Sequence, residues 1–333
     1  MKSRQWFNEE IAHLATPDED ARAVVQARAD DILRPTGALR RLDDLAVWMA
    51  GWQRTSSPTV ERPMGIVFAA DHGVAQSGVS KYPSEVTKAM LDAFATHRST
   101  ITSLAKLAGA QLQVVDVGVG RPSGDLRFER AVPDHRFDEC VESARRVIGS
   151  SDSDLFVFGE MGIGNTTAAA AVAHALLGGR AEDWVGRGTG VDDDGLARKV
   201  EAVESAVART HQLDPLSALA EVGGLELVAI AAAVLAARQC SIPVVLDGYV
   251  VTAAAAVLHA IRPDALDHCV AGHCSAEPGH RRLLTHIGLS PLLDLDMRLG
   301  EASGAMMAVP LVRMACAAVV EVSTFTEFFG PGQ

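Results

Sequence analysis

The chain has 333 residues, of which 48% are hydrophobic and 22% are charged. This length and composition exclude global disorder and allow one large α/β domain, alone or with a smaller one. The net charge of −12 argues against a surface that binds nucleic acid or an anionic membrane. An anionic substrate would therefore need a local pocket of glycine N–H groups with one or two cations.

The cysteines and the N-terminal residues bear on the cellular compartment. Five cysteines are scattered along the chain without a Cys-x-x-Cys pair, which indicates a reducing compartment rather than a disulfide framework. The first residues, MKSRQWFNEEIAH, contain no apolar signal core, so we expect a cytoplasmic protein. The most apolar later segments, near 227–237 and 250–258, are short and rich in alanine. They are expected to be buried helices and not membrane spans.

The predicted elements change character near residue 60. Residues 1–60 are expected to be helical and amphipathic, with helices at 21–33 and 39–52. Short apolar runs then predict strands at 64–70, 112–117, 155–158 and 244–247, separated by helical lengths such as 83–95. Helices between apolar strands favour a parallel sheet with right-handed crossovers. The span 118–148 has little pattern and is expected to be a surface connection, with an irregular strand around 128–131.

The stretch 154–173 joins an apolar strand to an alanine-rich helix through the turn GEMGIGNTT. Its glycines allow backbone N–H groups to approach a ligand, and Asn165, Thr166 and Thr167 are expected to cap the helix. The turn is therefore either a phosphate site or a tight turn that needs glycine. It lacks the Gly-Lys-Ser/Thr of a Walker A motif and the third glycine of a dinucleotide fingerprint. Glu160 adds a carboxylate at the carboxyl end of the strand, where ligands bind in α/β sheets.

A second glycine-rich loop, WVGRGTGVDDD at 184–194, precedes a helix that carries Lys199. It is either a solvated loop before an acidic helix start or a backbone nest in which Lys199 contacts a phosphate. The local pattern favours the solvated loop.

Acidic residues lie next to two further apolar segments. Asp247 ends the last predicted strand, where it would bind a ribose hydroxyl or cap the helix from 250. Glu301 lies between glycines before an apolar helix, where it would complement the helix dipole or point into a crevice. The stretch GHCSAEPGH at 272–280 holds histidine, cysteine and glutamate, but its spacing fits neither usual zinc ligands nor a Cys–His nucleophile.

Five blocks in a fixed order carry a resemblance that covers about residues 30–325. They are AADHGVAQSGVSKYPSEVT (69–87), GEMGIGNTT (159–167), GRGTGVDDDGLARK (186–199), LDGYVV (246–251) and RLGEASGA (298–305). Together they resemble the nicotinate-nucleotide–dimethylbenzimidazole phosphoribosyltransferase family. RPTGALRRLDDLAVW (34–48) is similar to the N-terminal segment of that family.

The resemblance implies a Rossmann-like parallel sheet flanked by helices, in a homodimer. It implies a large α/β nucleotide-binding domain at 61–304 and a small helical domain built from 1–60 and 305–333. The implied reaction moves phosphoribose from nicotinate mononucleotide to the benzimidazole-type base 5,6-dimethylbenzimidazole. The products are α-ribazole 5′-phosphate and nicotinate, in assembly of the cobalamin lower ligand. Nicotinate leaves readily from its pyridinium, so neither a cofactor nor a metal is expected.

The resemblance also assigns roles to residues. Glu301 is the general base, expected to have an ordinary pKa of about 4.3, and Glu160 is a second carboxylate near the base or ribose. The implied phosphate and ribose site comprises Gly162, Ile163, Gly164, Asn165, Thr166, Thr167, Gly188, Lys199 and Asp247. The implied acceptor-base pocket comprises Tyr82, Pro83, Met90, Met161 and Leu299.

Two departures from the family pattern concern the acceptor. Met90 or Ala89 stands where the family often has glutamine, and Tyr82 stands where some members have serine. A reshaped, more apolar pocket would result, because methionine adapts to varied shapes. Glu-Ala-Ser-Gly at 301–304 replaces the more frequent Glu-Gly-Thr-Gly but keeps the carboxylate and a hydroxyl.

Three alternatives remain open at this point. The same transfer to another acceptor, such as adenine or a phenol, is the nearest. A regulatory module that binds nucleotides without catalysis is the second. A Rossmann dehydrogenase ranks last, because the full glycine fingerprint and its ribose-binding acid are absent from the sequence.

Overall fold

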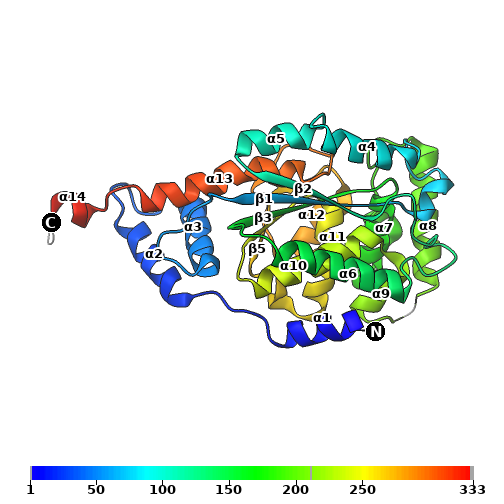
Figure 1. Cartoon of the computed structure of the whole chain (residues 1–333), viewed down its shortest axis with the longest axis horizontal. Coiled ribbons are helices and arrows are strands. Elements are labelled where there is room, and N and C mark those ends of the chain that lie inside the picture. The colour runs from blue at the N-terminus through cyan, green and yellow to red at the C-terminus, as the bar shows by residue number, and fades with distance from the viewer. Residues whose placement is uncertain (1, 211, 331–333) are drawn as a thin grey trace.

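A five-stranded parallel sheet runs through the centre of the computed structural model, with helices packed on both faces (Figure 1). The structure describes residues 2–210 and 212–330. In chain order the elements are α1 (Lys2–Ala12), α2 (Glu19–Asp31), α3 (Arg40–Gln53), β1 (Pro63–Ala70), η1 (Gly73–Ser77), α4 (Glu85–Ala95), α5 (Thr100–Ala108), β2 (Gln111–Gly118), α6 (Asp134–Gly149), β3 (Leu155–Met161), α7 (Asn165–Leu177), η2 (Ala181–Asp183), α8 (Asp193–Ala208), α9 (Pro215–Val222), α10 (Leu225–Gln239), β4 (Val244–Leu246), α11 (Tyr249–Ile261), η3 (Pro263–Leu266), β5 (Cys269–Ala271), β6 (His273–Cys274), α12 (Pro278–His286), β7 (Leu293–Asp294), α13 (Ser303–Val320) and α14 (Phe325–Phe329).

The strand order β2-β1-β3-β4-β5 makes this a doubly wound α/β fold. The Rossmann-like parallel sheet expected from the sequence is therefore confirmed, with the order that places the switch in winding between β1 and β3. All four strands predicted from apolar runs are present, while β5 and the short pair β6–β7 were not predicted. Parallel strands end at one edge, so the loops after β1, β3, β4 and β5 meet there.

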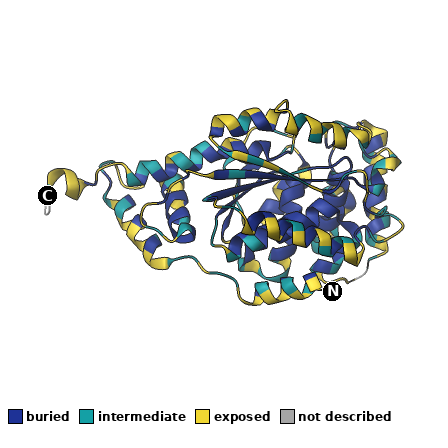
Figure 2. Cartoon of the chain, in the orientation of Figure 1, coloured by how far each residue is buried: buried dark blue, intermediate teal, exposed yellow. Residues whose placement is uncertain are grey.

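The residues of each central strand alternate between two hydrophobic cores. Phe68, Phe158 and Leu246 face the core formed with α6, α7, α10 and α11. Val67 and Val157 face the core formed with α5 and α13. Both faces are buried (Figure 2), which explains why the strands are continuous apolar runs without a polar side.

Helices α2 and α3 pack with the C-terminal part of α13 in a separate cluster. Its small core contains Val25, Ile32, Ala50 and Val319, and Figure 1 shows it beyond one end of the sheet. Helix α1 lies against α6 and α10 instead. We propose that the cluster corresponds to the small helical domain assigned to both chain ends.

The span 118–148 differs from the surface connection that we expected. Residues 134–149 form helix α6, which buries Phe137, Cys140, Val141 and Ala144 among other side chains. Residues 128–131 form no strand. The apolar residues of α6 recur every three to four positions and pack on β2 and α10, while the intervening charges stay in solvent.

Helix α13 alone, among the described residues, is long and apolar enough to cross a membrane by length and composition. More than half of this segment, 56%, is buried inside the protein. It packs against β3, β4, α3 and α5. Packing inside the fold therefore accounts for its apolar composition.

Candidate active site

The loops at the carboxyl edge of the sheet enclose a cavity of about 90 Å³. The turn after β3, the 186–189 loop, the start of α11, the 273–277 segment and the 298–300 segment each contribute to its wall. The lining residues are Glu160, Met161, Gly162, Ile163, Asn165, Thr166, Gly188, Thr189, Gly248, Tyr249, Val250, His273, Ser275, Glu277, Arg298, Leu299 and Gly300.

Three carboxylates converge beside this cavity. Glu301 N donates to the Glu160 backbone oxygen at 3.2 Å, so the two predicted catalytic residues are brought together. Asn165 Nδ2 donates to Glu160 Oε2. Asp247 Oδ1 accepts from Ala305 N at 2.9 Å, at the start of the helix that follows Glu301. Glu301 is buried, and its Oε2 has no hydrogen-bond partner among the described residues.

Burial first, and the neighbouring acids second, raise the pKa values of two of these carboxyls. Burial, followed by the charges of Asp247 and Glu226, raises the pKa of Glu160 to about 8. Burial and then Asp247 raise the pKa of Glu301 to about 7. The ordinary pKa expected for Glu301 is therefore wrong, because a buried acid among acids resists ionisation. A pKa of about 7 places the ionisation of Glu301 near neutral pH, and a pKa of about 8 favours the protonated form of Glu160 there.

The backbone that carries Glu301 has an unusual conformation. Gly300, Glu301 and Ala302 have φ values of +83°, +62° and +66°. Left-handed conformations are disfavoured for residues with a Cβ, and they cluster where the surrounding structure enforces them for function. The turn lies directly on β3, because a Cβ at Gly159 would come within 2.1 Å of Ala302 N. A Cβ at Gly300 would lie 2.5 Å from Glu160 Oε1.

Lys199 reaches the same edge from α8. It is 1% exposed, and its Nζ donates to Thr166 Oγ1 at 3.0 Å and to the Gly186 oxygen at 2.7 Å. The solvated-loop interpretation is therefore wrong for Lys199, which joins the two glycine-rich loops. Burial lowers the pKa of the Lys199 ammonium, and the charge of Glu277 opposes this shift.

Two predicted capping interactions differ in the structure. Gly164, with φ +95°, is the N-cap of α7, and no side chain caps that helix. The side chains of Asn165 and Thr166 instead contact Glu160 and Lys199, while Thr167 is buried with an unpartnered Oγ1 among the described residues. Asp247 does not cap the helix from 250, since it bonds to the start of α13.

The structure divides the predicted acceptor pocket into two groups. Met161 and Leu299 line the cavity, whereas Tyr82, Pro83 and Met90 do not. Tyr82 is 45% exposed, on the loop before α4, and Pro83 is exposed beside it. Met90 packs half-buried against the core shared by α5 and α13. Their role in an acceptor pocket stays a prediction.

Several polar lining residues were not predicted as site residues. His273 and Glu277 are buried. Among the described residues, neither ring nitrogen of His273 has a hydrogen-bond partner, and the Oε2 atom of Glu277 has none either. His273 Nε2 lies 3.3 Å from Asp247 Oδ1, and Gly188 N donates to Glu277 Oε1 at 2.7 Å. Both come from the 272–280 stretch. Its position after an apolar run, and not zinc-type spacing, was the signal available in the sequence.

A metal centre finds no support in the side chains that the structure places. No cluster of three or more His, Cys, Asp or Glu suited to a metal ion occurs in the ranges 2–210 and 212–330.

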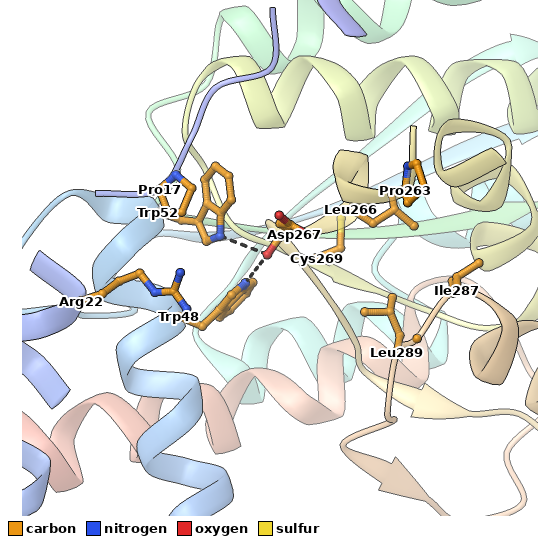
Figure 3. Close-up of a pocket in the computed structure, with 11 residues that line it drawn as sticks. Pro17, Arg22, Trp48, Trp52, Pro263, Leu266, Asp267, Cys269, Ile287 and Leu289 are labelled. Atoms are coloured by element: carbon orange, nitrogen blue, oxygen red, sulfur yellow. Dashed lines mark hydrogen bonds between the residues drawn. The ribbon is translucent and has the colours of Figure 1, made fainter. Parts of the chain in front are cut away.

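A second cavity, of about 380 Å³, lies near the start of β5, at the opposite edge of the sheet (Figure 3). Trp48 Nε1 and Trp52 Nε1 both donate to the Asp267 backbone oxygen, at 3.0 and 3.1 Å. These bonds connect α3 to the segment that leads into β5. We assign this cavity to the contact between the helical cluster and the sheet.

The fold and the edge site are those of a phosphoribosyltransferase. The sequence model of the family described as "Phosphoribosyltransferase" matches residues 14–328, nearly the whole chain. The acids, the glycine-rich turns and the buried lysine all lie within this match.

Individual relatives identify the particular family. The chain is 48% identical to a nicotinate-nucleotide–dimethylbenzimidazole phosphoribosyltransferase of Mesorhizobium japonicum, over 94% of each chain. It is 46% identical to a protein of the same name from Methylocella silvestris, over 95% of this chain and 93% of that one. A crystal structure of CobT from Thermus thermophilus is similar with a TM-score of 0.88 and 41% identity, covering 92% of this chain and 98% of that one. The chain belongs to the nicotinate-nucleotide–dimethylbenzimidazole phosphoribosyltransferase family.

Proposed function

We propose that this protein transfers phosphoribose from nicotinate mononucleotide to 5,6-dimethylbenzimidazole, giving α-ribazole 5′-phosphate and nicotinate for the cobalamin lower ligand. Its family membership and the names of its relatives support this reaction. The observation that carries the proposal is the buried Glu301 carboxyl, with a pKa of about 7, beside Glu160 at the ligand-binding edge of the sheet. A base with such a pKa suits proton transfer near neutral pH.

The reaction requires one bond to form and one to break at the anomeric carbon. One benzimidazole nitrogen attacks this carbon from the side opposite nicotinate, and the ribosyl–nitrogen bond electrons leave with nicotinate. The configuration inverts from β to α. The attacking base becomes positively charged until its other nitrogen loses a proton to the Glu301 carboxylate.

Glu160 has a different part in this proposal. Because its pKa is raised to about 8, its carboxyl retains a proton at neutral pH and donates a hydrogen bond to the substrate. Asn165 Nδ2 fixes the other carboxyl oxygen. A carboxyl that keeps its proton and a carboxylate that has lost its proton can act as donor and acceptor in one cavity.

The glycine-rich turns supply the anion site. Gly162 and Gly164 bring the backbone close to the N-terminus of α7, which favours a phosphate through its free N–H groups and dipole. Lys199 adds a buried cation through Thr166. The enclosed volume is about 90 Å³, so a bound nucleotide would extend past the exposed Arg298 and Leu299.

We also propose that the protein acts in the cytoplasm as a homodimer. The exposed aromatic side chains of Phe325, Phe328 and Phe329 at α14 support association, because contiguous exposed apolar groups are typical of contact surfaces.

A chromatographic assay of the purified protein with nicotinate mononucleotide and 5,6-dimethylbenzimidazole tests the transfer. Equal amounts of nicotinate and α-ribazole 5′-phosphate are expected. Turnover with adenine or a phenol, and none with the benzimidazole, would replace the proposed acceptor. Nucleotide binding without nicotinate release for any acceptor would point to a regulatory module.

A further inference from the structure

A buried imidazole–carboxylate pair lies behind the turn that follows β3. His72 Nε2 and Glu226 Oε1 are 2.6 Å apart, and both side chains are fully buried. His72 Nδ1 and Glu226 Oε2 have no hydrogen-bond partner among the described residues. Replacing a buried pair of this kind by apolar side chains is often neutral or stabilising. Stability alone therefore does not explain why the chain contains it.

Two glycines make room for the pair. A Cβ at Gly162 would lie 3.2 Å from both His72 Nε2 and Glu226 Oε1, and 2.6 Å from the Ala70 oxygen. A Cβ at Gly224 would lie 2.3 Å from His72 Cε1. Gly162 also lines the catalytic cavity, while His72 and Glu226 do not. The pair is thus separated from the cavity by the thickness of the Gly162 backbone.

The segment after β1 supports the same turn at a second point. Atoms of Ala75 in η1 lie 3.4 to 3.5 Å from the position of a Cβ on Gly164. On α4, Thr87 Oγ1 accepts from Ile163 N at 3.4 Å. Pairing between β1 and β3 ends at Met161, so these contacts hold the backbone where the sheet no longer does.

Glu226, one member of the pair, also acts on Glu160 through its charge. Glu226 is among the groups that raise the pKa of Glu160, after burial and Asp247. Besides burial, the groups that shift the pKa of Glu160 come from four places: Asp247 after β4, Glu226 on α10, Glu301 before α13 and Asn165 on α7. Both the place of the Glu160 carboxyl and its surroundings thus depend on α10 and the loop after β1.

We propose that His72 and Glu226 are positioning residues for the transfer. They hold the 161–165 turn in place, so that the Glu160 carboxyl stays against the 300–302 turn. This inference rests on the proposed function. Neither residue contacts substrate, and both act through the turn.

Hydrogen exchange tests the positioning role without any assay of turnover. Glu226→Gln preserves the size of the side chain and removes its charge, and His72→Gln is a second, separate variant. In the full chain, peptides covering 159–167 should exchange at least ~10-fold faster than in the wild type, while peptides covering 249–261 stay unchanged. Asp43→Asn is the matched control, because it breaks the largely buried Arg34–Asp43 pair in the helical cluster. It should leave 159–167 unchanged.

Kinetics with nicotinate mononucleotide and the benzimidazole provide the second readout. In either variant kcat should fall about 10-fold or more, and KM for nicotinate mononucleotide should rise as well, because the loosened turn is also the proposed phosphate site. Wild-type exchange and kcat in folded variants would overturn the positioning role. Faster exchange spread evenly over all peptides would overturn it too. If the wild type releases no nicotinate, the proposed function fails, and the exchange comparison still decides the role of the pair.

Discussion

Glu301 combines burial, a left-handed backbone and a carboxyl oxygen without a partner in the described part of the chain. Glu301→Gln keeps the shape of the side chain but removes the proton acceptor, so turnover should fall by roughly 10²- to 10⁴-fold. Nicotinate mononucleotide binding, measured by calorimetry, should change little. Glu321→Gln makes the same chemical change at an exposed position at the other end of α13 and should leave kcat unaltered. Near-normal turnover of Glu301→Gln would refute the base assignment.

The raised pKa of Glu301 predicts how the rate depends on pH. Only the ionised carboxylate accepts the benzimidazole proton, and its fraction increases as pH rises through about 7. Turnover should therefore increase about tenfold per pH unit below pH 6, reach a maximum between about pH 7 and 8, and fall at higher pH as the Glu160 donor loses its proton. A stopped assay from pH 5 to 9 at saturating substrate measures this profile. A rate already at its maximum at pH 5 would mean that the base has an ordinary pKa.

Lys199 is predicted to contribute to binding of the donor nucleotide. Lys199→Met keeps the buried aliphatic stem but removes the ammonium that contacts Thr166. A hydrogen bond to a charged group contributes about 1.5–3 kcal/mol, so Kd for nicotinate mononucleotide should rise roughly 10- to 100-fold. Lys88→Met, at an exposed position on α4, is the control. A change confined to the apparent affinity for the acceptor would contradict the phosphate role.

At the scale of elements, the contact between β3 and the 300–302 turn depends on Gly159. A methyl group at this position would lie 2.1 Å from Ala302 N, so Gly159→Ala must separate β3 from the residues beside Glu301. Melting temperature and kcat should both fall, kcat by at least about 10-fold, because small displacements of a catalytic group have large effects. Gly149→Ala is the control, since a Cβ there meets nothing within 4 Å. Unchanged kcat in Gly159→Ala would show that this contact does not position Glu301.

The elements also show where sequence reasoning succeeds and where it fails. β1 and β3 were predicted because burial on both faces makes them continuous apolar runs. β5 is as short as β4 but was missed because Asp267 and His268 interrupt the apolar residues before it. α6 was missed because its charges concealed the apolar spacing of Phe137, Val141 and Ala144. Glu160 and Glu301 were singled out because glycines mark the loops at strand and helix ends, and their catalytic roles stay predictions. No local pattern connects residues as distant as His72 and Glu226, which only the fold brings together.

At the scale of the whole molecule, α3 links the helical cluster to the sheet. The Trp48 and Trp52 indoles share one acceptor, the Asp267 oxygen, beside the cavity in Figure 3. They differ in burial: Trp52 is 2% exposed and lies under the Arg238 guanidinium at 4.6 Å, whereas Trp48 is only half-buried. Both bonds cross between segments that are far apart in the sequence.

Trp52→Phe should therefore lower the free energy of unfolding by about 2–4 kcal/mol, through lost packing, a lost cation–π contact and a lost hydrogen bond. Trp48→Phe should cost about 1 kcal/mol or less, because water can replace its bond. Urea unfolding followed by circular dichroism measures both. Helix α13 packs on α3 and begins directly after Glu301, so kcat in Trp52→Phe reports whether the cluster influences the site. Equal destabilisation by the two substitutions would mean that burial at α3 does not set the strength of this connection.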